Sequence, residues 1–207
     1  MTSRMTSIAI RSFVVASLAV VTLGGYGCGG NNDSAQLVGQ FTASSTPSAL
    51  HLVKLVPQSN NGTRVVVQAV VYGPDTALDM YTFAFDVKIG DTTVLAYVPN
   101  SAVAGNALQA FVGQTITAIA GPDGADPTHI VVSVSKLGGG LGNGVAGSSA
   151  VALSLSFDVQ KEGTSTLAIA TTPAPSVLDS QGGTIGSITF DSANGTVTAI
   201  STGGGGY

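Results

Sequence analysis

The sequence predicts an all-β protein, a nine- to ten-stranded antiparallel β-sandwich. Three observations predict it: two segments alternate strictly between apolar and polar residues, turn-forming residues separate many short apolar runs, and no segment has the three- and four-residue apolar spacing of a helix. The composition agrees, because only 9% of the 207 residues are charged and 28 are Gly. Small and β-branched residues with few charges are typical of sandwiches.

The clearest strand signals are two alternations with a period of two residues. Every second residue is apolar in residues 81–89, and the same holds for residues 151–159. This period places one face of a strand on a core and the other toward water. Weaker strands are expected at residues 48–56, 64–72, 93–98, 110–120, 129–137, 164–170, 184–190 and 196–201.

Two Asn-Gly sequences predict tight hairpins, because Asn and Gly tolerate the positive φ that such turns need. The sequence Asn60-Asn61-Gly62 lies between the runs 48–56 and 64–72. Asn194-Gly195 lies between the runs 184–190 and 196–201, and is expected to join them in the same way.

The first 27 residues predict an export signal. Arg4 and Arg11 provide a positive start, and the apolar stretch 13–23 is shorter than the roughly 20 residues that span a bilayer. Cys28, the single cysteine of the chain, follows this stretch. That arrangement resembles the lipobox of bacterial lipoproteins, which implies lipid attachment at Cys28 and a site in the outer membrane or at the cell surface.

The rest of the chain is expected to form one domain. Residues 28–47 are rich in Gly, Asn, Ser and Thr, which predicts a flexible tether. Residues 48–202 are assigned to the sandwich, and the Gly-rich residues 203–207 to a frayed tail. Membrane contact is expected only through the N-terminal lipid.

The charge distribution argues against nucleic-acid binding. The formal charge of −4 becomes −6 when Arg4 and Arg11 leave with the signal, and an acidic surface repels phosphate backbones. The remaining basic residues form no stripe along the sequence: Lys54, Arg64, Lys88, Lys136 and Lys161.

The sequence offers no catalytic constellation, and we predict that the protein is not an enzyme and uses no cofactor. His51 and His129 are far apart, so no zinc site can be assembled from them and Cys28. A G-x-S-x-G nucleophile elbow is absent. A glycosidase needs two facing carboxylates, and no acidic pair stands out because most aspartates lie in expected turns.

Two local patterns suggest ligands but are weak. Residues 142–147, GNGVAG, match G-x-G-x-x-G, yet that loop binds a pyrophosphate only when a helix follows it. Here an alternating segment follows, which predicts a strand. Asp123 and Asp126 are calcium candidates in a turn, although calcium takes six to eight oxygen ligands; no metal is therefore assigned.

The order of segments from residue 64 to residue 200 resembles a cohesin domain. The segments that carry the resemblance are, in order, RVVVQAVVYG, YTFAFDVKIGDTTVLAYV, HIVVSVSKLGG, GVAGSSAVALSLSFDVQKEGTSTLAI and DSQGGTIGSITFDSANGTVTAI. The family's Asp-Pro after the aromatic strand is replaced here by Lys88-Ile89-Gly90-Asp91. The resemblance implies jelly-roll topology for the sandwich. It also implies a non-catalytic envelope module that docks a protein, dockerin-like or another envelope protein, with a link to polysaccharide degradation.

Two alternatives remain at this point. A carbohydrate-binding module would stack aromatic rings on sugars. The chain has no Trp, so such a module would need a shallow cleft with Tyr72, Tyr81 or Tyr97, and Tyr81 is expected in the core. A structural envelope or adhesion protein is the other. The alternation itself predicts a binding face: with Phe83, Phe85, Val132 and Val134 inward, the outward side chains are Thr82, Ala84, Asp86, Lys88, Ser133 and Ser135.

Overall fold

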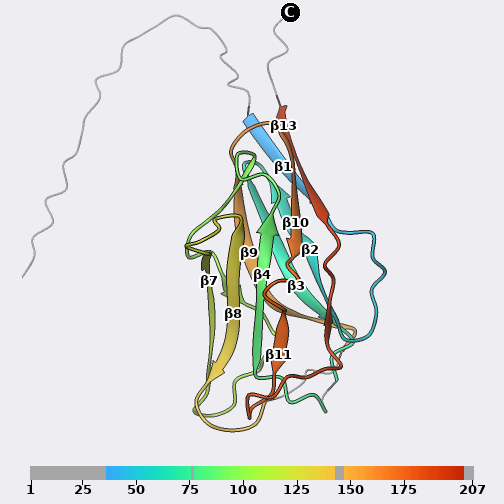
Figure 1. Cartoon of the computed structure of the whole chain (residues 1–207), viewed down its shortest axis with the longest axis vertical. Helices are drawn as coiled ribbons and strands as arrows, with labels where there is room; N and C mark the ends of the chain where they lie inside the picture. Colours follow the sequence, from blue (N-terminus) through green and yellow to red (C-terminus); the bar gives the residue numbers. More distant parts are fainter. Residues whose placement is uncertain (1–35, 76, 143–146, 203–207) are drawn as a thin grey trace, which may run out of the picture. The chain divides into compact units, whose positions relative to one another are not determined.

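The computed structural model describes residues 36–75, 77–142 and 147–202 (Figure 1). These residues form thirteen β-strands, nine of which are seven residues or longer. None of the described residues lies in a helix. The strands make two sheets packed face to face, so the predicted β-sandwich is confirmed. The chain passes repeatedly from one sheet to the other, as in jelly rolls.

The first sheet has seven strands. It contains β1 (Gln36–Thr42), β4 (Thr82–Ile89), β7 (Thr115–Pro122), β8 (His129–Leu137), β10 (Gly163–Ile169), β11 (Ser176–Leu178) and β13 (Gly195–Thr202). Their order is β1-β13-β10-β4-β8-β7, and β11 also pairs with β4. β7 is therefore one edge of this sheet (Figure 1).

The second sheet has six strands. It contains β2 (Leu52–Asn61), β3 (Arg64–Tyr72), β5 (Leu95–Tyr97), β6 (Val103–Ala104), β9 (Ser149–Val159) and β12 (Thr189–Phe190). Their order is β12-β2-β3-β9-β5, and β6 also pairs with β9. The pairing of β12 with β2 is parallel, which departs from the otherwise antiparallel arrangement.

The core between the sheets is built from the alternating residues that the sequence assigned to it. Phe83, Phe85, Val132 and Val134 are all buried on the first sheet, as predicted. From the second sheet, Leu153, Leu155 and Phe157 face them.

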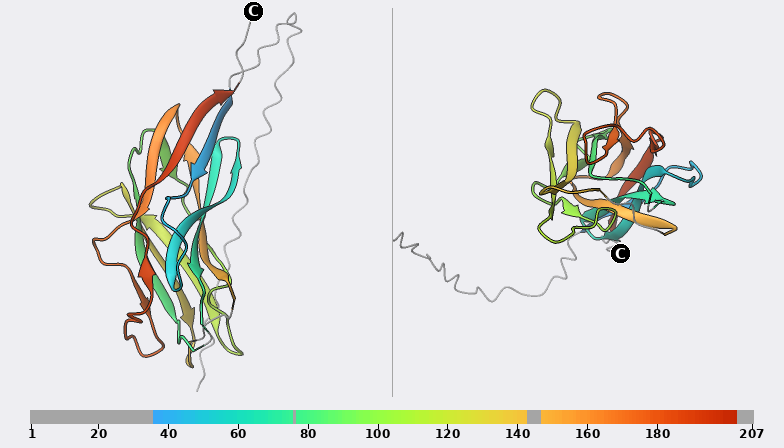
Figure 2. Two further views of the ribbon diagram at one scale, coloured as in Figure 1. Left: turned by 90° about the vertical axis from the view of Figure 1, so that its right-hand side faces the viewer. Right: turned by 90° about the horizontal axis from the view of Figure 1, so that it is seen from below.

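The expected tether of residues 28–47 is wrong for residues 36–42, which form β1. This strand runs antiparallel to β13 (Figure 2). Phe41 lies opposite Val197 in their register. Phe41 is buried in the core, which accounts for the pairing. The sandwich therefore includes residues 36–42 and does not begin at residue 48; residues 28–35 lie outside the described part.

One of the two predicted hairpins is confirmed. Gly62 has a φ of 63° in the turn between β2 and β3, and these strands pair along their length. The prediction at Asn194-Gly195 is wrong, because β12 pairs with β2 and not with β13. A Cβ on Gly195 would lie 2.5 Å from the Phe41 ring, so Gly serves close packing there and not a turn.

Candidate binding face

β4 and β8 lie side by side in the middle of the candidate face, and their register brings its small side chains together. Thr82 lies opposite Ser135, and Ala84 opposite Ser133. The Thr82 hydroxyl donates to Ser135 Oγ over 3.0 Å. Because the residues between them point into the core, these four half-buried side chains share the outer surface of the first sheet.

Two exposed apolar side chains extend this surface, and the sequence-based face did not include them. Val131 of β8 lies between Asp86 of β4 and Gly121 of β7, and 48% of it is exposed. Ile119 of β7 lies opposite Ser133 and is 66% exposed. The alternation that turns Ser133 outward also turns Val131 outward, so that signal was present in the sequence. We call the surface of Thr82, Ala84, Ile119, Val131, Ser133 and Ser135 the docking face.

Asp86 differs from its expected role, because it is only 4% exposed. β4 pairs with β10 near one end and with β11 near the other, and the connection between those strands passes over Asp86. There the Ala170 N–H donates to the Asp86 carbonyl oxygen over 2.9 Å. The carboxylate lies 3.4 Å from His129 Nδ1. Asp86 therefore orients His129 and offers little surface to a partner.

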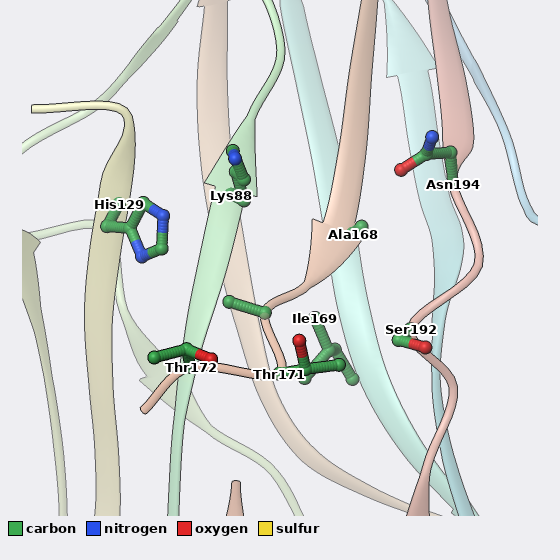
Figure 3. Close-up of a pocket in the computed structure, with 9 residues that line it drawn as sticks. Lys88, His129, Ala168, Ile169, Thr171, Thr172, Ser192 and Asn194 are labelled. Carbon is green, nitrogen blue, oxygen red and sulfur yellow. The ribbon is translucent and has the colours of Figure 1, made fainter. Parts of the chain in front are cut away.

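Lys88 borders an open pocket of about 640 Å³ beside the docking face (Figure 3). Lys88 and His129 come from neighbouring strands, while hydroxyl and amide groups come from the connections after β10 and before β13. The polar side chains of the lining are Lys88, His129, Thr171, Thr172, Ser192 and Asn194. No aromatic ring other than the His129 imidazole lines this pocket, so it has no platform for stacking a sugar ring.

The surroundings of His129 do not form a nucleophile–base pair. Its Nδ1 faces Asp86, and its Nε2 lies 3.8 Å from Asp126 Oδ2. Within the described residues, no hydroxyl or thiol hydrogen-bonds to this imidazole. Nucleophilic catalysis needs such a pair within hydrogen-bond reach.

The two calcium candidates are engaged in local turns. Asp123 Oδ1 accepts a hydrogen bond from the Ala125 N–H over 3.0 Å. Asp126 Oδ1 accepts from both the hydroxyl (2.6 Å) and the N–H (2.9 Å) of Thr128, and these bonds hold the pKa of Asp126 below its usual value. In the described ranges, no three His, Cys, Asp or Glu side chains lie close enough to hold a metal ion.

The tyrosines considered for a sugar cleft do not gather on one surface. Tyr97 of β5 is buried, packs edge-on against Phe157 and donates its hydroxyl to the Ala120 carbonyl. Tyr81 precedes β4 and is half-buried, not in the core as expected, and its hydroxyl donates to the Gly138 carbonyl. Tyr72 lies at the end of β3 in the other sheet. These positions give no shared platform.

Several sequence features fall wholly or partly outside the described residues. The structure does not describe Cys28, the export signal or the tail 203–207, so these assignments remain predictions. Most of the G-x-G-x-x-G sequence also lies outside the described residues, but the segment after it is β9, a strand as predicted, and not a helix. In the part of the chain that the structure covers, no helix is long and apolar enough to cross a membrane.

Comparison with solved structures finds the same kind of sandwich elsewhere. The structure is similar to cohesin domains. The type II cohesin dyad of the ScaA adaptor scaffoldin from Acetivibrio cellulolyticus is 16% identical over 71% of this chain and 48% of its own, with a TM-score of 0.47. This chain thus spans about half the length of the dyad.

Two single cohesins from the same organism give similar values. A type II cohesin domain from its cellulosome is 15% identical over 74% of this chain and 95% of its own, with a TM-score of 0.47. The sixth cohesin of its scaffoldin B, in complex with a Cel5 dockerin mutant, is 21% identical over 66% of this chain and 89% of its own, with a TM-score of 0.43. No family model matches the sequence, and no curated protein matches it.

Proposed function

We propose that this protein is a non-catalytic module of the bacterial envelope that docks a protein partner through the docking face. The observation that carries the proposal is the exposure of Val131 and Ile119 among small, uncharged side chains on a regular sheet. Apolar side chains on such a surface mark interaction sites when they lie together. Charged residues are depleted in the centre of protein–protein interfaces, and the docking face has none.

Protein docking is better supported than the carbohydrate alternative. The pocket beside Lys88 lacks a stacking ring, and Tyr72, Tyr81 and Tyr97 lie apart. The sequence resemblance to cohesins makes dockerin modules the first partners to test, followed by other envelope proteins. A role in an assembly that degrades polysaccharides would follow only from the identity of such a partner.

Steric blocking of the docking face is expected to abolish capture of the partner. The change is Ala84→Arg, with Val131→Arg as a second variant, because a bulky charge in the centre of a flat interface prevents close approach. Capture is measured by immobilising the protein and applying dockerin modules, and then envelope extracts after crosslinking. We expect at least a tenfold loss of bound partner, equivalent to about 1.4 kcal/mol.

The matched control is Val103→Arg, since Val103 is similarly exposed but lies on β6 of the other sheet. It should capture the partner as the wild type does. If Ala84→Arg and Val131→Arg both bind as the wild type, the partner uses another surface and the proposal is wrong.

We also propose that Cys28 carries the lipid that attaches the module to the outer membrane or cell surface. The position of the single cysteine after a short apolar stretch supports this. Two or more acyl chains are enough for stable anchoring. Intact mass analysis of the mature protein should give an acylated chain that begins at Cys28, and Cys28→Ser should release it into the soluble fraction. An unmodified mature protein that starts elsewhere would contradict the assignment.

A further inference from the structure

β7 is an edge strand whose sequence lacks the usual protection against strand pairing. It ends the order of the first sheet, and its sequence, TITAIAGP, contains no charged residue and has proline only at its last position (Figure 1). Edge strands of soluble proteins usually carry Lys, Pro or a bulge, which prevent another strand from pairing with them. The register of β7 with β8 is regular from Thr115 to Pro122, so no bulge interrupts it.

The ladder shows which backbone groups of β7 face outward. The Lys136 N–H donates to the Tyr81 carbonyl over 3.0 Å, so even-numbered residues of β8 bond to the β4 side. Odd-numbered residues of β8 therefore bond to β7, where their partners include Thr117 and Ile119.

The backbone N–H and C=O groups of Ile116, Ala118 and Ala120 consequently point away from the sheet. The Tyr97 hydroxyl donates to the Ala120 carbonyl over 3.2 Å from that side, which agrees with this direction. A carbonyl oxygen has two lone pairs, so this bond leaves room for another donor. The outward groups are regularly spaced and suit one more antiparallel strand.

We propose that the partner of this edge is β7 of a second copy of the chain, paired antiparallel about a two-fold axis at Ala118. The strand is self-complementary in that register. Ile116 lies opposite Ala120 of the second copy on the inner face, which matches a large side chain with a small one. Thr117 lies opposite Ile119 of the second copy on the outer face, where two β-branched side chains pair favourably. No like charges meet, because the strand has none.

The pairing joins the two sheets into one continuous sheet and closes after two copies, as an isologous interface does. Three hydrogen-bonded residue pairs supply about six main-chain bonds. The pairing of the two β7 strands also covers part of Ile119, which is otherwise exposed to water. The contact area is small, so we expect a dissociation constant on the order of 100 µM in solution. Copies attached to one membrane would reach a higher effective concentration.

Sedimentation of a fragment of residues 33–207, which forms a compact unit of its own, tests the dimer. Between about 5 and 500 µM, a range chosen around the expected constant, the wild type should shift from monomer to dimer. Ala118→Pro should stay monomeric, because proline removes the outward N–H that the dimer needs. The hydrogen bonds between β7 and β8 are kept, since the Ala118 N–H does not point toward β8. Thr117→Lys should also stay monomeric, since it adds an edge charge. The matched control Thr198→Lys, exposed on β13 of the same sheet, should dimerise.

Thermal melting shows whether each variant is folded, and if Ala118→Pro unfolds, Thr117→Lys decides the question. A wild type that stays monomeric at the highest concentration overturns the proposal, and so does a folded Thr117→Lys variant that dimerises like the wild type. The docking proposal is tested separately: Ala84→Arg, on β4, should dimerise normally while it loses the partner.

Discussion

Phe85→Ala is expected to lower the free energy of unfolding by about 3–5 kcal/mol. The side chain is 3% exposed and lies between the sheets, with its ring 5.9 Å from that of Phe190. Truncation removes apolar contacts and leaves a cavity, because regular strands on both sides prevent collapse around the gap. Urea denaturation measures the loss as a lower midpoint at an unchanged slope.

Ala84→Arg is the matched comparison, since residue 84 adjoins Phe85 in the chain but faces the opposite side of β4. Surface substitutions usually change stability by about 0.5 kcal/mol or less. The two variants should therefore separate cleanly, one losing stability and the other losing partner capture. A Phe85→Ala protein as stable as the wild type would mean that β4 is not oriented as described.

The strongest part of the sequence prediction was the alternation around β4, since a period of two specifies which side chains enter the core. The same reasoning was less accurate for β9. Its alternation was expected to turn Val151 inward, but a register shift opposite Ala69 and Val70 leaves Ala150 and Ala152 buried and Val151 half-buried. A bulge depends on the partner strand, so the β9 sequence alone does not reveal it.

β1 was missed because its core face contains a glycine. Gly39 interrupts the apolar series between Leu37 and Phe41, and the surrounding composition resembles a linker. A Cβ at this position would lie 2.4 Å from a methyl group of Val159 and 2.7 Å from one of Val65. Two residues of the opposite sheet thus fill the space that a side chain at residue 39 would occupy. Local sequence patterns do not show this close approach.

The candidate site was predictable to the extent that it consists of strand faces. Thr82, Ala84 and Ser133 follow directly from alternation, and Val131 could have been added by the same rule. The burial of Asp86 was not predictable, because the segment that covers it follows β10, far along the chain. The pocket beside Lys88 likewise combines neighbouring strands with two connections that are distant in the sequence.

Lys54 and Asp191 form a buried polar cluster that fastens the connection after β1 to the segment before β13. Each is only 7% exposed. Lys54 Nζ donates to the Ser44 carbonyl over 2.8 Å and to the Thr46 carbonyl. The Asp191 carboxylate accepts from the hydroxyls of Ser44 and Thr46 and, over 3.0 Å, from the Ala193 N–H. The sequence gives no local signal for this cluster, since Asp191 lies more than 100 residues along the chain from Ser44, Thr46 and Lys54.

Asp191→Ala is expected to lower the free energy of unfolding by about 2–3 kcal/mol at neutral pH, because hydrogen bonds to a charged acceptor are strong and three donors would lose that acceptor. Urea denaturation at pH 7 measures this loss. Asp75→Asn is the control, since Asp75 is exposed and accepts one local bond from the Ala77 N–H. A loss in the control as large as in Asp191→Ala would point to a general charge effect and not to the cluster.

The same carboxylate should make stability depend on pH. Burial acts to raise the pKa of Asp191, but the bonds from Ser44, Ala193 and Thr46 outweigh it and the pKa lies below its usual value. The unfolded chain therefore binds a proton at a higher pH than the folded chain does. The stabilisation is complete above the unfolded pKa of about 4 and is lost as the pH falls through the lower folded value. Asp191→Asn has no such proton to bind, so its midpoint should fall less between pH 5 and pH 2 than that of the wild type; parallel profiles would show that the cluster does not hold the charged carboxylate.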